Sequence, residues 1–149
     1  MLNAINRGIG LIFNTYILHL KSKKTDSVHL IQKLTMAYSK NGNQITFSED
    51  NSIDFEYPIE EIFEVDGILV VTLKIPNNVR DRRNVFAFSR TGDFLWQIKD
   101  VPLYHNGDFC PFIGALVNKQ NEFVLFNWCD TAVIIDPQTG NVIRTYQTK

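Results

Sequence analysis

Two stretches of this 149-residue sequence, NVFAFSRTGDFLWQI (residues 84–98) and TAVIIDPQTGNVIRTY (residues 131–146), share one plan. Each contains an apolar segment, a turn that ends in glycine and a second apolar segment, a pattern that predicts a β-hairpin. The turn glycines, Gly92 and Gly140, are 48 residues apart, and a weaker copy, LTMAYSKNGNQITF, places Gly42 another 50 residues upstream. This spacing predicts a repeated β architecture with all three glycines in turns between adjacent antiparallel strands.

A second hairpin precedes each strong copy: EIFEVDGILVVTL (residues 61–73) and IGALVNKQNEFVLFNW (residues 113–128). Asp66-Gly67 is the kind of dipeptide that most strongly predicts a two-residue turn, because both residues tolerate positive φ. This turn would place Val65 opposite Ile68. Each block then reads strand, tight turn, strand, loop, strand, glycine turn, strand, which amounts to four antiparallel strands per repeat.

The hairpins NVFAFSRTGDFLWQI and AVIIDPQTGNVIRTY resemble the final hairpins of blades in bacterial quinone-dehydrogenase-type β-propellers. The resemblance implies blade geometry alone, because no cofactor-binding residue can be matched, and we expect no cofactor. A closed propeller has about 4–8 blades, whereas this chain has two full units and a partial third. Apolar faces and edge strands are then left open, to be covered by packing the sheets as a sandwich, by the N-terminal segment or by another subunit.

We therefore expect a mainly β fold: two blade-like four-stranded antiparallel sheets, in sandwich or partial-propeller packing, with an N-terminal helix or hairpin. The whole chain, residues 1–149, should form a single domain. We divide it into an N-terminal extension, a partial repeat and two repeats, at residues 1–25, 26–57, 58–98 and 110–147. The strand ILVVTL has no polar residue before Thr72, so it should be buried on both faces.

Residues 2–20 fit two structures. Their apolar residues recur at helical spacing, but Gly8 and Gly10 each cost a helix about 1 kcal/mol, and a hairpin is the alternative. The apolar run is too short to span a bilayer and no small-residue cleavage pattern follows it. With a net charge of -1 and no basic surface with interleaved aromatics, we expect neither membrane nor nucleic-acid binding. These features, with only two cysteines, predict a cytoplasmic protein.

The acidic middle of the chain is its one compositional oddity. Residues 41–73 contain no Lys or Arg and eight carboxylates, at Glu49, Asp50, Asp54, Glu56, Glu60, Glu61, Glu64 and Asp66. A solvated strand face would explain them, and so would a docking surface for a basic partner, which would speed association and set specificity. If the second interpretation holds, Glu60, Glu61, Glu64 and Asp66 should be exposed, contiguous and unpaired.

The leading hypothesis is a non-enzymatic protein-binding module that uses this acidic surface. An inhibitor of the immunity or antitoxin type, directed at a basic toxin, would fit its size and acidity. A homo-oligomer that covers the open sheet edges is a further expectation. The alternative is a small hydrolase or ligand-binding domain with a site in the 75–83 and 99–110 loops, using His105, Asp108 and Arg82. The three neighbouring arginines Arg80, Arg82 and Arg83 could bind phosphate or carboxylate, or form ion pairs in a solvated loop.

The two cysteines, Cys110 and Cys129, flank the hairpin of residues 113–128. A turn centred between Lys119 and Gln120 would place them directly opposite each other, within disulfide range, and a one-residue shift would separate them. In a cytosolic protein we expect two reduced, buried thiols instead. None of the three histidines has a second His or Cys at metal-ligand spacing, so no metal site is expected.

Overall fold

The computed structural model describes residues 38–105, 107 and 109–149, so the predicted N-terminal extension and the first part of the partial repeat lie outside the described residues. Residues 38–149 form one compact unit. The described residues contain no helix, and their strands form three antiparallel sheets. This confirms the expected mainly β class, whereas the choice between an N-terminal helix and a hairpin falls outside the description.

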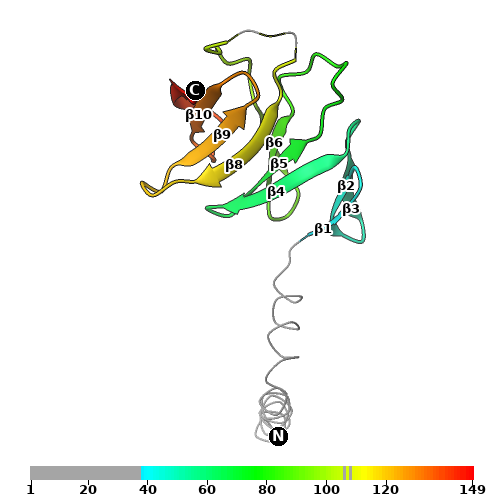
Figure 1. The fold of residues 1–149 in the computed structure, drawn as a ribbon. Helices are drawn as coiled ribbons and strands as arrows, with labels where there is room; N and C mark the ends of the chain where they lie inside the picture. The colour runs from blue at the N-terminus through cyan, green and yellow to red at the C-terminus, as the bar shows by residue number, and fades with distance from the viewer. Residues whose placement is uncertain (1–37, 106, 108) are drawn as a thin grey trace, which may run out of the picture. The chain divides into compact units, whose positions relative to one another are not determined.

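The three sheets follow one another along the chain (Figure 1). Sheet A contains β1 (Ser39–Asn41), β2 (Gln44–Ser48) and β3 (Asn51–Asp54). Sheet B contains β4 (Ile59–Val65), β5 (Ile68–Leu73), β6 (Val85–Ser89) and β7 (Phe94–Gln97). Sheet C contains β8 (Phe112–Val117), β9 (Phe123–Asn127), β10 (Thr131–Ile135) and β11 (Val142–Gln147). Sheets B and C are four-stranded, as predicted, and each has its strands in sequence order. Sheet A, with three strands, lies within the residues assigned to the partial repeat.

The turns lie where the sequence predicts them. Gly42, Gly92 and Gly140 lie between β1 and β2, β6 and β7, and β10 and β11, all with positive φ. Asp66 and Gly67 join β4 to β5 with φ values of 49° and 77°. Positive φ at both central residues is typical of the type I′ turn, whose twist matches that of the flanking strands. Val65 consequently pairs with Ile68, as predicted.

Sheet B has a hydrophobic core on each side. All residues of β5 are buried, as expected for ILVVTL. Because side chains alternate along a strand, Ile68 and Val70 pack with residues of sheet C, whereas Leu69, Val71 and Leu73 pack with residues of sheet A. The sheets are therefore stacked in the order A, B, C, with sheet B in the middle.

The turn of each later sheet packs on an aromatic residue of the sheet before it. The indole N–H of Trp96 in β7 donates a hydrogen bond to the carbonyl of Pro137, in the β10–β11 turn, at 2.9 Å. In the same way, Asn51 of sheet A donates to the carbonyl of Thr91, in the β6–β7 turn, at 2.7 Å. These contacts hold the sheets against one another. Within sheets B and C, the strand order places β4 and β8 at one edge and β7 and β11 at the other.

Candidate functional site

The predicted acidic residues lie on the edge strand β4 and its turn. Glu60, Glu61, Glu64 and Asp66 are all exposed. Register with β5 places Glu61 on the same face of sheet B as Phe63 and Val65, which pack toward sheet C, and Glu64 on the opposite face. Glu60 is the extra residue of a β-bulge between Ile59 and Glu61. The carboxylates therefore line an edge rather than one continuous face.

Two of these carboxylates are paired within the chain, so the expectation that all four are unpaired was wrong. Lys74 Nζ lies 3.9 Å from Glu60 Oε2, and the Arg90 guanidinium forms an ion pair with Glu64. Both cations are distant in sequence and are brought to β4 by the β5 and β6 strands. Burial, and secondarily the charge of Glu64, raise the pKa of Tyr38. Glu61 and Asp66 have no ion pair with any residue in the described part of the chain.

The edge strands β4 and β8 differ in how they are protected. Charged side chains and bulges are the usual devices that stop an edge strand from pairing with another chain, and β4 has both. Strand β8 also has a bulge, at Ile113, but its sequence, FIGALV, has no charged residue. Ile113, Leu116 and Val117 of β8 are 51%, 43% and 48% exposed. Strand β8 is thus an apolar sheet edge of the kind that natural proteins normally cover.

An open groove of about 490 Å³ lies at the beginning of β8. It is lined by Phe109, Pro111, Ile113 and Trp128 on the side of sheet C, and by Glu60 and Lys74 on the side of sheet B. Trp128, in the turn after β9, is 61% exposed. Large exposed aromatics in such grooves are typical anchors of protein interfaces.

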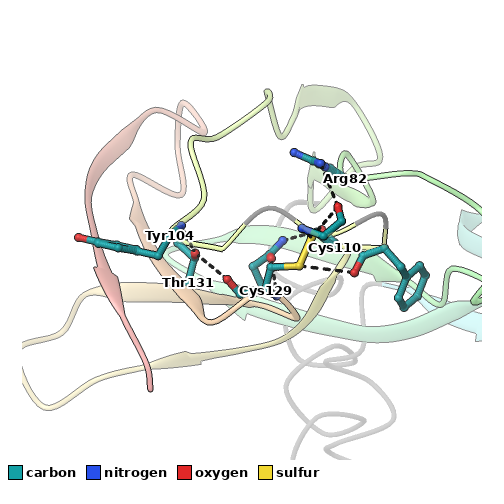
Figure 2. Close-up of a disulfide and its surroundings, with 8 residues drawn as sticks. Arg82, Tyr104, Cys110, Cys129 and Thr131 are labelled. Carbon is teal, nitrogen blue, oxygen red and sulfur yellow. Dashed lines mark hydrogen bonds between the residues drawn. A yellow bond between two sulfur atoms is a disulfide. The ribbon is translucent and has the colours of Figure 1, made fainter.

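A disulfide between Cys110 and Cys129 braces this groove, with the two Cα atoms 5.3 Å apart (Figure 2). The expectation of two reduced thiols was therefore wrong. Near the turn the β8–β9 register pairs Val117 with Phe123, one residue away from the register that would align the cysteines. The bulge at Ile113 then shifts the pairing, so that Phe112 pairs with Asn127 and the cysteines face each other. Because Pro111 and Trp128 directly adjoin the cysteines, the bond fixes the sheet C side of the groove.

The loop between β7 and β8 is held to the rest of sheet C by hydrogen bonds. The backbone N–H of Tyr104 donates to the hydroxyl of Thr131 at 2.9 Å, and this hydroxyl donates to the carbonyl of Cys129 at 3.0 Å (Figure 2). The side-chain amide of Asn127 donates to the carbonyl of Cys110 at 2.6 Å. The loop that leads into β8 is thus ordered by polar side chains as well as by the disulfide.

The alternative site is only partly assembled in the described residues. Arg82 donates a hydrogen bond to the carbonyl of Gly107 at 3.2 Å, so the 75–83 and 99–110 loops do meet (Figure 2). Asp108 lies outside the described residues, and His105 is exposed. A polar groove of about 500 Å³ here is lined by Arg80, Asp81, Arg82, Arg83, Gln97 and Asp100, and His105 does not line it.

The described residues contain no metal-ligand cluster and no membrane-spanning helix. No group of three or more His, Cys, Asp or Glu side chains there could hold a metal ion. No helix in that part of the chain is long and apolar enough to cross a membrane.

Comparison with known proteins gives one match. Residues 35–147 match the family described as a domain of unknown function, DUF7957. No curated protein and no solved structure is similar to this chain. The matched region includes all three sheets, with the edge strands β4 and β8 and the groove at Trp128.

Proposed function

The chain belongs to the family DUF7957, and we propose that it is a non-enzymatic protein-binding domain whose partner carries a basic surface. The observation that carries the proposal is the exposure of Glu60, Glu61, Glu64 and Asp66 along a single sheet edge. An acidic edge attracts a basic partner over several ångströms and raises the rate of encounter. An inhibitor of the immunity or antitoxin type would use such a surface against a basic toxin.

Internal ion pairs distinguish two of the four carboxylates from the other two. Glu60 and Glu64 are already paired with Lys74 and Arg90, so a basic partner would have to compete with these internal cations. Glu61 and the turn residue Asp66 have no competing cation among the residues that the structure describes. We therefore propose that Glu61 and Asp66 contribute most to recognition of the partner.

The repeated sheets support the interpretation of the fold as propeller-like. Each four-stranded sheet keeps its strands in sequence order, and each later turn packs on the sheet before it. We propose that the three sheets are successive blade-like units in an open stack, with β4 and β8 as equivalent strands. A second copy of the chain is the alternative to a different partner protein at those two edges.

The state of the cysteines bears on where the protein works. The sequence predicts the cytoplasm, where thiols stay reduced, but the Cys110–Cys129 disulfide persists in an oxidising compartment. We therefore propose that the domain works in an oxidising compartment. Alkylation of free thiols in freshly isolated protein, followed by mass analysis, tests this. Two alkylated cysteines would show that both thiols are reduced and would favour the cytoplasm instead.

The acidic proposal is tested by affinity capture from native cells with the full chain as bait. The wild type is compared with the double variant Glu61→Gln/Asp66→Asn and with the matched control Glu49→Gln/Asp50→Asn, which removes two exposed charges outside β4. We expect a basic protein to be retained by the wild type and the control, to be released as salt is raised, and to be lost from the β4 variant. Equal retention by all three proteins at every salt concentration would exclude this surface.

A further inference from the structure

The outer edge of β8 presents backbone groups that no other strand of sheet C can bind. The N–H of Asn118 donates to the carbonyl of Glu122 at 3.0 Å, so the backbone of Asn118 is directed toward β9. In an antiparallel pair these groups point alternately toward and away from the partner strand. The register of β8 with β9 therefore directs the N–H and C=O groups of Ala115 and Val117 away from the sheet.

The same edge is already occupied at one residue, and the occupant shows what it accepts. The side-chain amide of Asn84 receives a hydrogen bond from the Phe112 N–H at 2.9 Å and donates one to the Phe112 carbonyl at 2.8 Å. A carboxamide that binds both groups of one residue replaces the C=O and N–H groups that an opposing residue of an antiparallel strand would offer. Asn84 is fully buried, so this arrangement is a fixed part of the fold.

We propose that the outer edge of β8, from Val117 to Ile113, takes up an extended segment of the partner protein, which adds to sheet C as a fifth strand. Main-chain hydrogen bonds would supply affinity in this mode of binding, and pockets for alternate side chains would supply specificity. The proposal deepens the proposed function and rests on the domain being a protein-binding one. The segment would continue the pairing that Asn84 begins at Phe112.

The surroundings of the edge define the chemistry of the segment. The groove beside Ile113 and Trp128 would accept an apolar or aromatic side chain, and the disulfide holds this groove in place before binding. Glu61 lies on the face of β4 that is directed toward sheet C. Glu60 of β4 lines the same groove as Ile113 of β8. The segment should therefore combine an apolar anchor with basic residues.

The experiment selects random linear peptides of about twelve residues, displayed on phage, against the full chain. The binding of each selected peptide is then detected by hydrogen exchange of the β8 amides. We expect binding to slow exchange at Ala115 and Val117 by at least about tenfold. The amide of Leu116 already faces β9 and serves as the internal control, because its exchange should change little. Emission from Trp128, which is far more exposed than Trp96, should shift to the blue.

Substitutions separate the strand-addition mode from other ways of binding. Ala115→Pro removes an outward N–H while keeping the bonds to β9, and Ala115→Gly keeps that N–H as the matched control. Trp128→Ala should weaken peptide binding by at least about tenfold, and Trp128→Phe should restore most of it. We expect Ala115→Pro to abolish the protection and Ala115→Gly to retain it. If Ala115→Pro does not fold, the exchange rates of the wild type still decide the matter.

Three results would overturn the proposal. The first is a selection in which no peptide pool is enriched. The second is a set of bound peptides that leave Ala115 and Val117 in free exchange. The third is a concentration-dependent dimer in which those amides are protected without peptide, because a second copy of the chain would then be the occupant.

The tests of the two proposals fail in different ways. If the captured basic protein binds Trp128→Ala and Ala115→Pro as well as the wild type, the β8 site is wrong and the acidic function stands. If peptides bind β8 as expected but capture is unaffected by Glu61→Gln/Asp66→Asn, the acidic function is wrong and the β8 site stands.

Discussion

Gly140 lies against the indole ring of Trp96, so closely that a β carbon on Gly140 would fall 2.6 Å from Trp96 Cδ2. At the equivalent glycine, Gly92, an added β carbon would fall 2.6 Å from Phe47 Cδ2 and 2.5 Å from Asn51 Nδ2. Each turn glycine therefore serves the interface between two sheets as well as its own hairpin. The turn glycines that recur in the sequence mark the places where one sheet packs on the previous one.

Replacing Gly140 with Ala should destabilise the protein more than the same change at Gly67. Both residues have positive φ, which costs alanine about 1–2 kcal/mol, but nothing lies within 4 Å of a β carbon on Gly67. The steric conflict with Trp96 should add about 1 kcal/mol or more at Gly140. Urea unfolding of both variants measures the difference, and equal losses would show that the contact with Trp96 contributes nothing.

The buried Asn84 should be one of the residues most sensitive to substitution. Its side chain makes three hydrogen bonds of 2.8–2.9 Å, to the carbonyls of Leu73 and Phe112 and from the Phe112 N–H. Asn84→Ala leaves these buried groups without partners, and we expect a loss of about 3 kcal/mol or more of unfolding free energy. The control is Asn51→Ala, which removes a single hydrogen bond at the surface and should cost about 1 kcal/mol.

Changing Asn84 to Asp gives a sharper test of the same contacts. An ionised carboxylate cannot donate to the two carbonyls, whereas the protonated acid can donate to one of them. The defect should therefore shrink as the pH falls toward about 4, because burial near two carbonyls raises the pKa of the new carboxyl above its unfolded value. A defect independent of pH between 7 and 4 would contradict this account of the site.

The disulfide should contribute measurably to stability. It closes a loop with a sequence separation of 19 residues, for which the loss of entropy in the unfolded chain corresponds to about 3 kcal/mol. Denaturant unfolding with and without reductant should differ by about this amount for the wild type. The double variant Cys110→Ser/Cys129→Ser should resemble the reduced protein and ignore reductant. An unfolding midpoint unaffected by reductant in the wild type would mean that the bond does not stabilise the fold.

Local sequence signals predicted the turns and the buried strand, because each depends on neighbouring residues. Asp66-Gly67 and the three turn glycines carry their conformational preference within the hairpin itself, and ILVVTL shows its double burial by having no polar face. The cysteine pairing could not be fixed in the same way. It depends on a bulge at Ile113 that shifts the register by one residue, and FIGALV gives no sign of it.

The candidate site was predicted less well, because it depends on residues far apart in sequence. Arg90 reaches Glu64 across 26 residues, and Asn84 reaches Phe112 across 28. Composition revealed the acidic strand but not these partners. The sequence predicts that Trp128 lies in a strand, and only its exposure beside the uncharged β8 edge marks it as a candidate anchor. The lack of charge in FIGALV was the one signal that could have indicated an open edge.

The stability of the folded protein should depend on pH through Glu122, on the outer face of sheet C. Arg144 binds both carboxylate oxygens of Glu122, at 2.7 and 3.0 Å, and Asn118 donates to Oε2 at 2.8 Å. The hydrogen bond from Arg144, and next that from Asn118, lower the pKa of Glu122 below its ordinary value of 4.5. A carboxyl whose pKa is lowered on folding stabilises the folded state fully above its unfolded pKa, and this stabilisation is lost as the pH falls through the folded value.

We therefore expect the wild type to be more stable than Glu122→Gln at pH 7, and the difference to shrink as the pH falls below 4.5. Unfolding midpoints across this range measure it, and high salt should reduce the difference because the pair is partly exposed. In an Arg144→Met background the substitution should lose most of its effect, and a constant difference from pH 7 to about 3 would contradict the assignment. Arg144 stands four residues after Gly140, as Trp96 stands four after Gly92, and each pairs with the central strand of its sheet. Where sheet B presents an indole on which sheet C packs, sheet C presents a charged pair at the equivalent position.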